Sequence, residues 1–193
     1  SVIKSAELLG LSPRLVQYKQ RCPCVNWCSS DYRKMLESYG YQFGKNSADK
    51  QFPPIFLSLP KRQLRKLLSI VFEAEGSCSQ LGIEFMSASP TLVNQIAYML
   101  LCFGIRGTIR PKWSMATNGH RIRRKYYRLS LFGEDARQFT RQIGFLSERK
   151  RRVSEHFLQD PKYAWSKYGY PVTDAITTLK QLGFGFILRG LNG

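Results

Sequence analysis

The stretch that decides the fold is Leu67-Leu68-Ser69-Ile70-Val71-Phe72-Glu73-Ala74-Glu75-Gly76-Ser77. It is an apolar run that ends in two carboxylates and a glycine. Apolar residues recur at helical spacing from Leu64 onward, so we expect an amphipathic helix from about Lys61 to Ala74. Gly76 then stands where a helix-ending glycine is expected.

The two glutamates lie at the end of the helix where stability alone favours a cation. Helix C-termini carry partial negative charge, so lysine or arginine is the usual choice there. Glu73 and Glu75 instead make this end anionic. A divalent metal ion is one candidate partner, because carboxylate oxygens are ligands that such ions prefer. A solvated helix end whose glutamates bind nothing is the alternative.

The chain after Gly76 alternates between strand and helix patterns. Period-two segments indicate strands, and apolar residues three and four positions apart indicate helices. We expect strands over 78–80 and 83–87, a helix over 90–103, strands over 105–113 and 122–131 joined by a turn over 117–120, and a helix over 134–143. This α-β-β-α-β-β-α order predicts an α+β domain whose helices cover one face of an antiparallel sheet and leave the other open.

The motif and the segments after it resemble one known family. Residues 68–76 are similar to the nine-residue signature of the LAGLIDADG homing endonucleases, with both acids and the final glycine in place. The family's later strands and helix ends have similar segments in this chain, in the same order, at residues 83–89, 98–105, 127–131 and 143–150. The resemblance covers roughly residues 50–155 and implies a saddle-shaped antiparallel sheet.

The resemblance implies metal-dependent cleavage of both strands of a long DNA site. In the family, the acid before the last glycine binds the divalent metal, here Mg²⁺; that acid is Glu75, and Gly76 is assigned to the metal site with it. Glu73 would be structural or would support the ligand. Family members pack two motif helices together, so one motif implies a homodimer or a second LAGLIDADG half. Ile70 replaces a small family residue and would hold the helices apart.

The charge of the chain predicts a polyanionic partner. There are 30 Lys and Arg against 13 Asp and Glu, a formal net charge of +17. No acidic residue occurs between Glu84 and Glu134, and aromatic residues are interleaved with the basic ones. A twisted antiparallel ribbon fits a DNA major groove, so double-stranded DNA is expected to contact Arg106, Arg110, Lys112, Arg121, Arg123, Arg124 and Lys125. A solvated charged face is the alternative.

Residues 1–45 are expected to form a small helical unit of their own. Segment 5–18 has the spacing of two helices around a glycine turn, which resembles the helix-turn-helix of bacterial repressors. A third helix is expected over 30–38. An ordinary helical hairpin is the alternative. In the DNA-binding interpretation, the residues near the groove are Arg14, Gln17 and Lys19.

The five cysteines are odd in number and irregularly spaced, which suits a reducing compartment, cytoplasmic or organellar, better than a disulfide framework. Cys22, Cys24 and Cys28 are close enough to suggest zinc, but no fourth ligand is near, so thiols without a metal are the simpler interpretation. No stretch approaches 18 consecutive apolar residues, and no membrane span is expected.

These observations divide the chain into four parts and favour one function. The parts are the helical unit 1–45, a linker over 46–54, the LAGLIDADG domain over 55–158 and a C-terminal extension over 159–193. The function expected is site-specific double-strand cleavage of DNA by an intein- or intron-encoded homing endonuclease. Two alternatives stay open. One is a decayed LAGLIDADG domain that binds DNA as a regulator, and the other is an intron RNA maturase.

Overall fold

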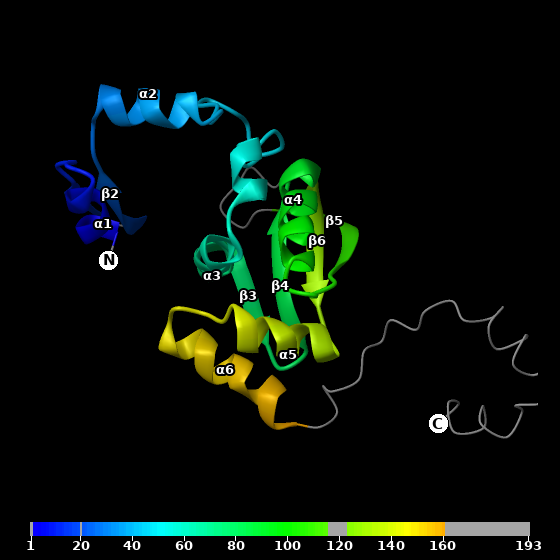
Figure 1. Ribbon diagram of the computed structural model, residues 1–193. Coiled ribbons are helices and arrows are strands. Elements are labelled where there is room, and N and C mark those ends of the chain that lie inside the picture. The colour runs from blue at the N-terminus through cyan, green and yellow to red at the C-terminus, as the bar shows by residue number, and fades with distance from the viewer. Residues whose placement is uncertain (1, 20, 116–122, 161–193) are drawn as a thin grey trace, which may run out of the picture.

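A four-stranded antiparallel sheet with helices on one face forms the larger unit of the chain (Figure 1). The computed structural model describes residues 2–19, 21–115 and 123–160. The expected turn over 117–120, Arg121 and the extension beyond Asp160 lie outside the described residues. The sheet has the order β3-β4-β6-β5 and is built from β3 (Gly76–Ser79), β4 (Gly82–Ser87), β5 (Thr108–Met115) and β6 (Arg123–Leu131).

The helices confirm the predicted order of elements. A short 3₁₀ turn, η1 (Pro54–Ser58), leads into the motif helix. The helices of this unit are α3 (Lys61–Glu75), α4 (Pro90–Leu101), α5 (Gly133–Gln142) and α6 (Glu148–Gln159). Within the described ranges, none of the helices has the length and apolar character needed to cross a lipid bilayer.

The core lies between the sheet and helices α3, α4 and α5. Phe72 of the motif helix is fully buried, with its ring centroid 4.6 Å from that of Phe139 and 5.8 Å from that of Phe85. Leu129 and Leu131 of β6 face the same core. Burying each large apolar side chain contributes about 1.5–3 kcal/mol, so these contacts fix the position of α3 on the sheet.

Gly76 ends the motif helix for a reason that the sequence did not reveal. Its backbone is extended, with φ −84° and ψ 155°, and not in the left-handed conformation of a typical helix-ending glycine. A Cβ at Gly76 would lie 2.5 Å from the carbonyl oxygen of Phe72. The glycine is therefore required because β3 starts directly against the last turn of α3.

The N-terminal unit is not a helix-turn-helix, so that prediction is wrong. Its elements are α1 (Val2–Leu8), β1 (Arg14–Tyr18), β2 (Arg21–Asn26) and α2 (Ser30–Ser38). The segment expected to form the second helix is strand β1, which pairs antiparallel with β2. Leu15 lies opposite Val25, and a cross-strand pair of apolar side chains that includes a β-branched valine favours a hairpin over a helix. The helix expected over 30–38 is confirmed.

The end of the expected linker is fastened to the sheet unit. The side-chain amide of Gln95 on α4 accepts from the Phe52 N–H at 2.8 Å and donates to the Phe52 carbonyl at 3.0 Å. The Ser89 hydroxyl, at the start of α4, donates to the Lys50 carbonyl at 2.5 Å. These bonds hold residues 50–52 against α4, so this part of the chain does not act as a free tether.

Candidate functional site

Glu75 is the last residue of α3, and its side chain is exposed. It borders a cavity of about 360 Å³ that lies between α3 and residues 40–45 and 49–52. Ile70, Val71 and Ala74 of α3 line the same cavity. The carboxylate that the sequence assigns to the metal therefore stands at the edge of a hollow, where solvent, an ion or a phosphate can reach it.

Glu73 and Lys150 fasten the end of α3 to the start of α6. The Lys150 ammonium donates to the carbonyl oxygens of Phe72, Glu73 and Gly76, at 3.1, 2.5 and 2.8 Å. Lys150 as a whole is 7% exposed. Because the last carbonyls of a helix have no partner within it, this buried cation satisfies them and offsets the negative helix end.

The Glu73 carboxylate makes the reciprocal contact. It accepts from the backbone N–H groups of Leu146 and Ser147, at 3.0 and 3.1 Å, just before α6 begins. Burial on its own raises the pKa of Glu73, but the hydrogen bonds from Ser147 and Leu146 and the nearby Lys150 charge outweigh it, so the pKa is lowered overall. Glu73 therefore stays ionised as a structural acceptor.

One carboxylate is suited to hold a metal ion at the end of α3. Glu75 offers a hard oxygen ligand, which fits Mg²⁺, and Mg²⁺ usually takes only one or two protein carboxylates beside water and phosphate oxygens. Gly76 is the other residue predicted at the metal site, and its carbonyl accepts from the Lys150 ammonium. Across the described ranges, no group of three or more His, Cys, Asp or Glu is placed to hold a metal. Glu75 fits as part of a ligand set that something else must complete.

The outward side of α3 carries an apolar stripe. Ile70 is 55% exposed, Ala74 is exposed, and Leu67 and Val71 are half-buried. The cavity beside Glu75 lies on one side of Ile70, and a second hollow of about 680 Å³ lies on the other, between α3 and residues 143–146. An amphipathic helix normally buries such a stripe, so this surface is suited to pack against another helix.

The open face of the sheet carries three of the predicted DNA-binding residues. Side chains alternate between the two faces of a strand, and Leu129 of β6 points into the core. Arg128 therefore points to the open face. Arg110, its partner on the neighbouring strand β5, points to the same face. Further along the same ladder, Lys112 pairs with Tyr126 and Ser114 with Arg124. Arg110, Lys112 and Arg124 thus lie on one face with Arg128, which the sequence analysis missed.

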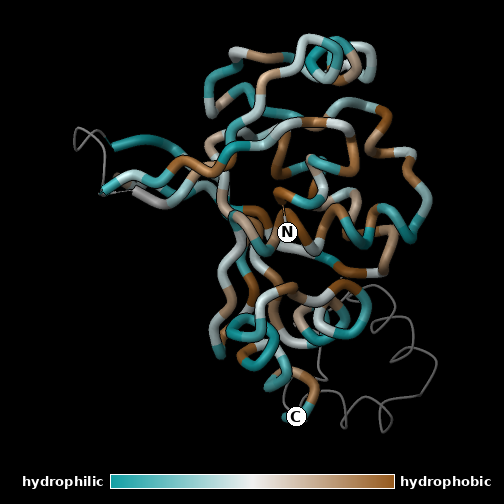
Figure 2. Tube along the Cα trace, turned by 90° about the vertical axis from the view of Figure 1, so that its left-hand side faces the viewer, coloured by the Kyte–Doolittle hydropathy of each residue, from teal (hydrophilic) through white to brown (hydrophobic). Residues whose placement is uncertain are grey.

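Arg123 and Lys125 lie on the opposite side of the β5–β6 hairpin. There they pair with Met115 and Trp113, both of which are more than half exposed. Both sides of the hairpin are accessible here, because this end of it projects beyond the body of the domain (Figure 2). The Lys125 ammonium lies 5.4 Å from the Tyr127 ring centroid, in a cation–π contact.

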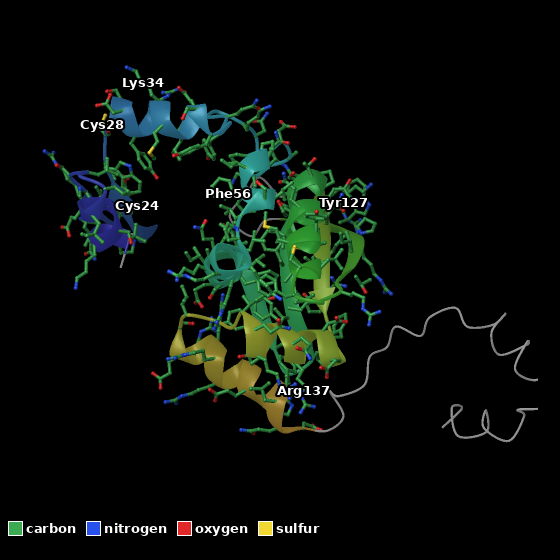
Figure 3. The ribbon with its side chains drawn as sticks, in the orientation of Figure 1. Cys24, Cys28, Lys34, Phe56, Tyr127 and Arg137 are labelled. Carbon is green, nitrogen blue, oxygen red and sulfur yellow. The ribbon has the colours of Figure 1, made fainter. Side chains whose placement is uncertain are left out.

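The remaining predicted residues are placed elsewhere. Arg106 precedes β5, and its N–H donates to the buried Asp135 carboxylate at 2.7 Å. Arg14 and Gln17 are exposed on β1, and Lys19 is exposed in the turn that follows it, so none of them lies on a recognition helix. In the same unit, Cys24 lies on β2 and Cys28 just before α2, at separate places (Figure 3).

Comparison with known sequences identifies the unit that carries these features. The profile of the LAGLIDADG-like domain family matches residues 62–144. Residues 62–144 are a LAGLIDADG-like domain. The match begins in the first turn of α3 and ends just after α5, so it contains the motif helix and the whole sheet.

The sequence relatives share a segment with this chain and not their full length. The chain is 31% identical over 128 residues to the DNA polymerase II large subunit of Thermococcus kodakarensis, which covers 58% of this chain and 7% of that protein. It is 29% identical over 137 residues to an ATP-dependent DNA helicase of Methanocaldococcus jannaschii, which covers 67% of this chain and 12% of that protein. The chain therefore spans only a small part of these relatives.

Solved structures show the same fold for the LAGLIDADG-like domain. The crystal structure of the homing endonuclease I-DmoI with DNA and calcium is similar with a TM-score of 0.53 and 16% identity. The similarity covers 80% of this chain and 71% of that one. The predicted fold, a LAGLIDADG core with an antiparallel sheet, is confirmed.

Lys150 was the residue at this site that was hardest to predict from the sequence. It belongs to the run Arg149–Arg152, which is typical of a solvated basic helix face. Its helical phase was the available signal, because Lys150, Ser154 and Phe157 share one side of α6 and all three are buried. Arg128 was available from the strand alternation, since it lies opposite Arg110.

Proposed function

We propose that this chain provides one half of a site-specific DNA endonuclease of the homing endonuclease type. The observation that carries the proposal is the exposed Glu75 carboxylate at the end of the motif helix, beside a cavity and next to the start of a basic sheet. Double-stranded DNA would lie on the open face, with its backbone near Glu75, where α3 ends and the sheet begins. The solved I-DmoI structures contain DNA with calcium, manganese or magnesium, which supports both parts of this proposal.

The metal ion would be held by Glu75, with Mg²⁺ as the natural ion for one exposed carboxylate. When bound, such an ion polarises a phosphate oxygen and lowers the pKa of a bound water. The chain's own part is to hold the carboxylate in place, and Lys150 does so by fixing the last turn of α3. Arg110, Lys112 and Arg124 would hold the duplex by neutralising phosphates.

The apolar stripe on α3 is where the other half would pack. Leu67, Ile70, Val71 and Ala74 would meet the motif helix of a second copy or of a second LAGLIDADG half, which would bring a second acid to Glu75. The axes of two packed helices lie about 8–10 Å apart, depending on the side chains at the contact. A side chain as large as Ile70 would place these two helices at the larger end of that range. Sedimentation of the chain at micromolar concentration, with Ile70→Glu as the comparison, tests this packing.

The sequence relatives support an origin of this chain as a mobile insertion within other genes. A polymerase subunit and a helicase have different activities, yet both match this chain over a small share of their length. A segment shared by such different proteins is better explained as an insertion than as part of either activity. We therefore propose that the chain is intein- or intron-encoded.

The proposal is tested by cleavage of a plasmid library in Mg²⁺. Wild-type protein should linearise a subset of plasmids, and Glu75→Gln should cleave them at least about 100-fold more slowly, because a metal ligand supplies several kcal/mol to the transition state. The matched control is Glu155→Gln, an exposed acid on α6. Equal cleavage by wild type and Glu75→Gln would remove Glu75 from the mechanism.

A DNA-binding regulator without cleavage is the second candidate. The bulky, exposed Ile70 on the helix face favours it, since this residue would widen the distance between two motif helices. A protein of this kind would select one duplex sequence, without cleaving it, in Mg²⁺. Competition between duplex DNA and structured RNA in the same assay separates both candidates from an RNA maturase.

A further inference from the structure

The open face of the sheet carries a carboxylate among its cations. Glu84 Oε1 lies 3.4 Å from Arg128 Nη1, and it accepts from the Ser130 hydroxyl at 3.3 Å. Glu84 is on β4 and Arg128 on β6, the two central strands of the sheet. The pair therefore sits in the middle of the open face, and the other basic residues lie toward the β5 edge.

The pair is held in place but still accessible. Both side chains are 34% exposed. The Nε of Arg128 is buried and has no hydrogen-bond partner in the part of the chain that is described. The strand ladder fixes the two backbones, because Glu84 lies opposite Ser130 and Met86 opposite Arg128. One acceptor and one planar donor group are thus presented side by side.

A carboxylate in this position works against binding to the DNA backbone. Phosphates repel it, so it lowers the affinity that Arg110, Lys112 and Arg124 supply. In a major groove, however, a carboxylate accepts from the amino group at cytosine N4, and an arginine donates to guanine O6 and N7. One C·G base pair presents that donor and those acceptors next to each other, which matches the chemistry of the pair.

We propose that Glu84 and Arg128 together read one C·G base pair in the DNA site. Glu84 accepts from cytosine N4, and Arg128 turns from Glu84 to guanine O6 and N7 of the same pair. This inference rests on the proposed DNA binding by the open face and does not require cleavage. It makes Glu84 a specificity-determining residue, because its contact discriminates between bases while adding nothing to phosphate binding.

The experiment is a binding selection from a random duplex DNA pool, in EDTA, with sequencing of the bound fraction. Wild type should enrich a motif that contains a C·G position. In Glu84→Gln the preference at that one position should fall by roughly 5- to 150-fold, the range for one good base contact. Glutamine pairs with adenine N6 and N7, so A·T should rise there. The control Glu155→Gln removes an equal charge on α6 and should leave the motif unchanged.

A second variant keeps the test valid if Glu84→Gln unfolds. Arg128→Lys keeps the charge but loses the planar donor fork, and it should weaken the preference at the same position. A thermal melt of each variant checks folding. A motif identical in wild type and in folded variants at every position overturns the inference and leaves the proposed DNA binding intact. If wild type enriches no motif at all, the proposed DNA binding itself fails.

Discussion

Glu73 and Glu75 are two residues apart on the same helix end, and their surroundings are opposite. Glu73 accepts two backbone N–H groups at the start of α6 and lies beside the buried Lys150. Glu75 is exposed at a cavity and makes no hydrogen bond or ion pair with any described residue. Residues at this spacing face away from each other on a helix. The comparison shows that one acid secures the helix end, which leaves the other available for chemistry.

The largest loss of stability is expected when the buried Lys150 ammonium is removed. Lys150→Met leaves three carbonyl oxygens at the junction of α3 and β3 without their cation and should lower the free energy of unfolding by about 3–5 kcal/mol, as for one partner removed from a buried charged pair. Urea denaturation measures the change. Arg149→Met, at an exposed neighbouring position, should stay within about 0.5 kcal/mol of wild type. Equal losses in both variants would contradict the role given to Lys150.

A smaller loss is expected at the junction of α3 and β3. Gly76→Ala places a methyl group 2.5 Å from the Phe72 carbonyl oxygen, so the backbone must shift, at a cost of about 1–3 kcal/mol. Ser77→Ala, at the next and exposed position, is the control. The difference in melting temperature between these two variants measures the strain. A Gly76→Ala protein as stable as wild type would show that the close approach of strand and helix is not required.

Glu73→Gln should lower the free energy of unfolding by about 1 kcal/mol near neutral pH. It should also change how that free energy depends on pH. The folded-state pKa of Glu73 is lowered, so the unfolded chain binds its proton more readily. Its contribution is therefore complete above the unfolded pKa, near 4.5, and is lost as pH falls through the folded pKa. Denaturation curves from pH 7 to pH 3 should show a weaker acid destabilisation in the variant. An unchanged acid slope would contradict the ionised role of Glu73.

The smallest stability effect is expected at Glu75. Glu75→Gln changes an exposed side chain with no described partner, so its melting temperature should match wild type, with a free-energy difference within about 0.5 kcal/mol. Scanning calorimetry of wild type, Glu73→Gln and Glu75→Gln gives the ranking. A loss at Glu75 as large as that at Glu73 would show that both acids are structural.

Local sequence patterns predicted a helix or strand correctly wherever the pattern fits only one kind of secondary structure. The apolar stripe from Leu64 to Phe72 located α3, and the strand pattern in residues 122–131 located β6. Residues 14–18 were misassigned because Gly10 and Pro13 suit both a turn between helices and the start of a hairpin. The pairing with residues 21–26 decides between the two, and pairing is a contact that the local spacing of one segment does not contain.

The candidate site was predicted in part for the same reason. Glu75 follows from its place in the motif, and Arg110, Lys112 and Arg124 follow from charge and strand alternation. The contact of Lys150 with α3 joins residues more than 70 positions apart, as does the Glu73 contact with residues 146 and 147. The helical phase of α6 indicates that Lys150 is buried, but its partners depend on how α5 and α6 pack, so no local pattern predicts these contacts.

The central claim is that the two acids divide structure and chemistry between them. The most direct test is the Mg²⁺-dependent cleavage rate of Glu75→Gln and Glu73→Gln, on one selected plasmid, well below both melting temperatures. We expect Glu75→Gln to lose at least about 100-fold in rate, while Glu73→Gln stays within a few-fold of wild type. Cleavage retained in Glu75→Gln, or lost equally in both variants, would contradict the account.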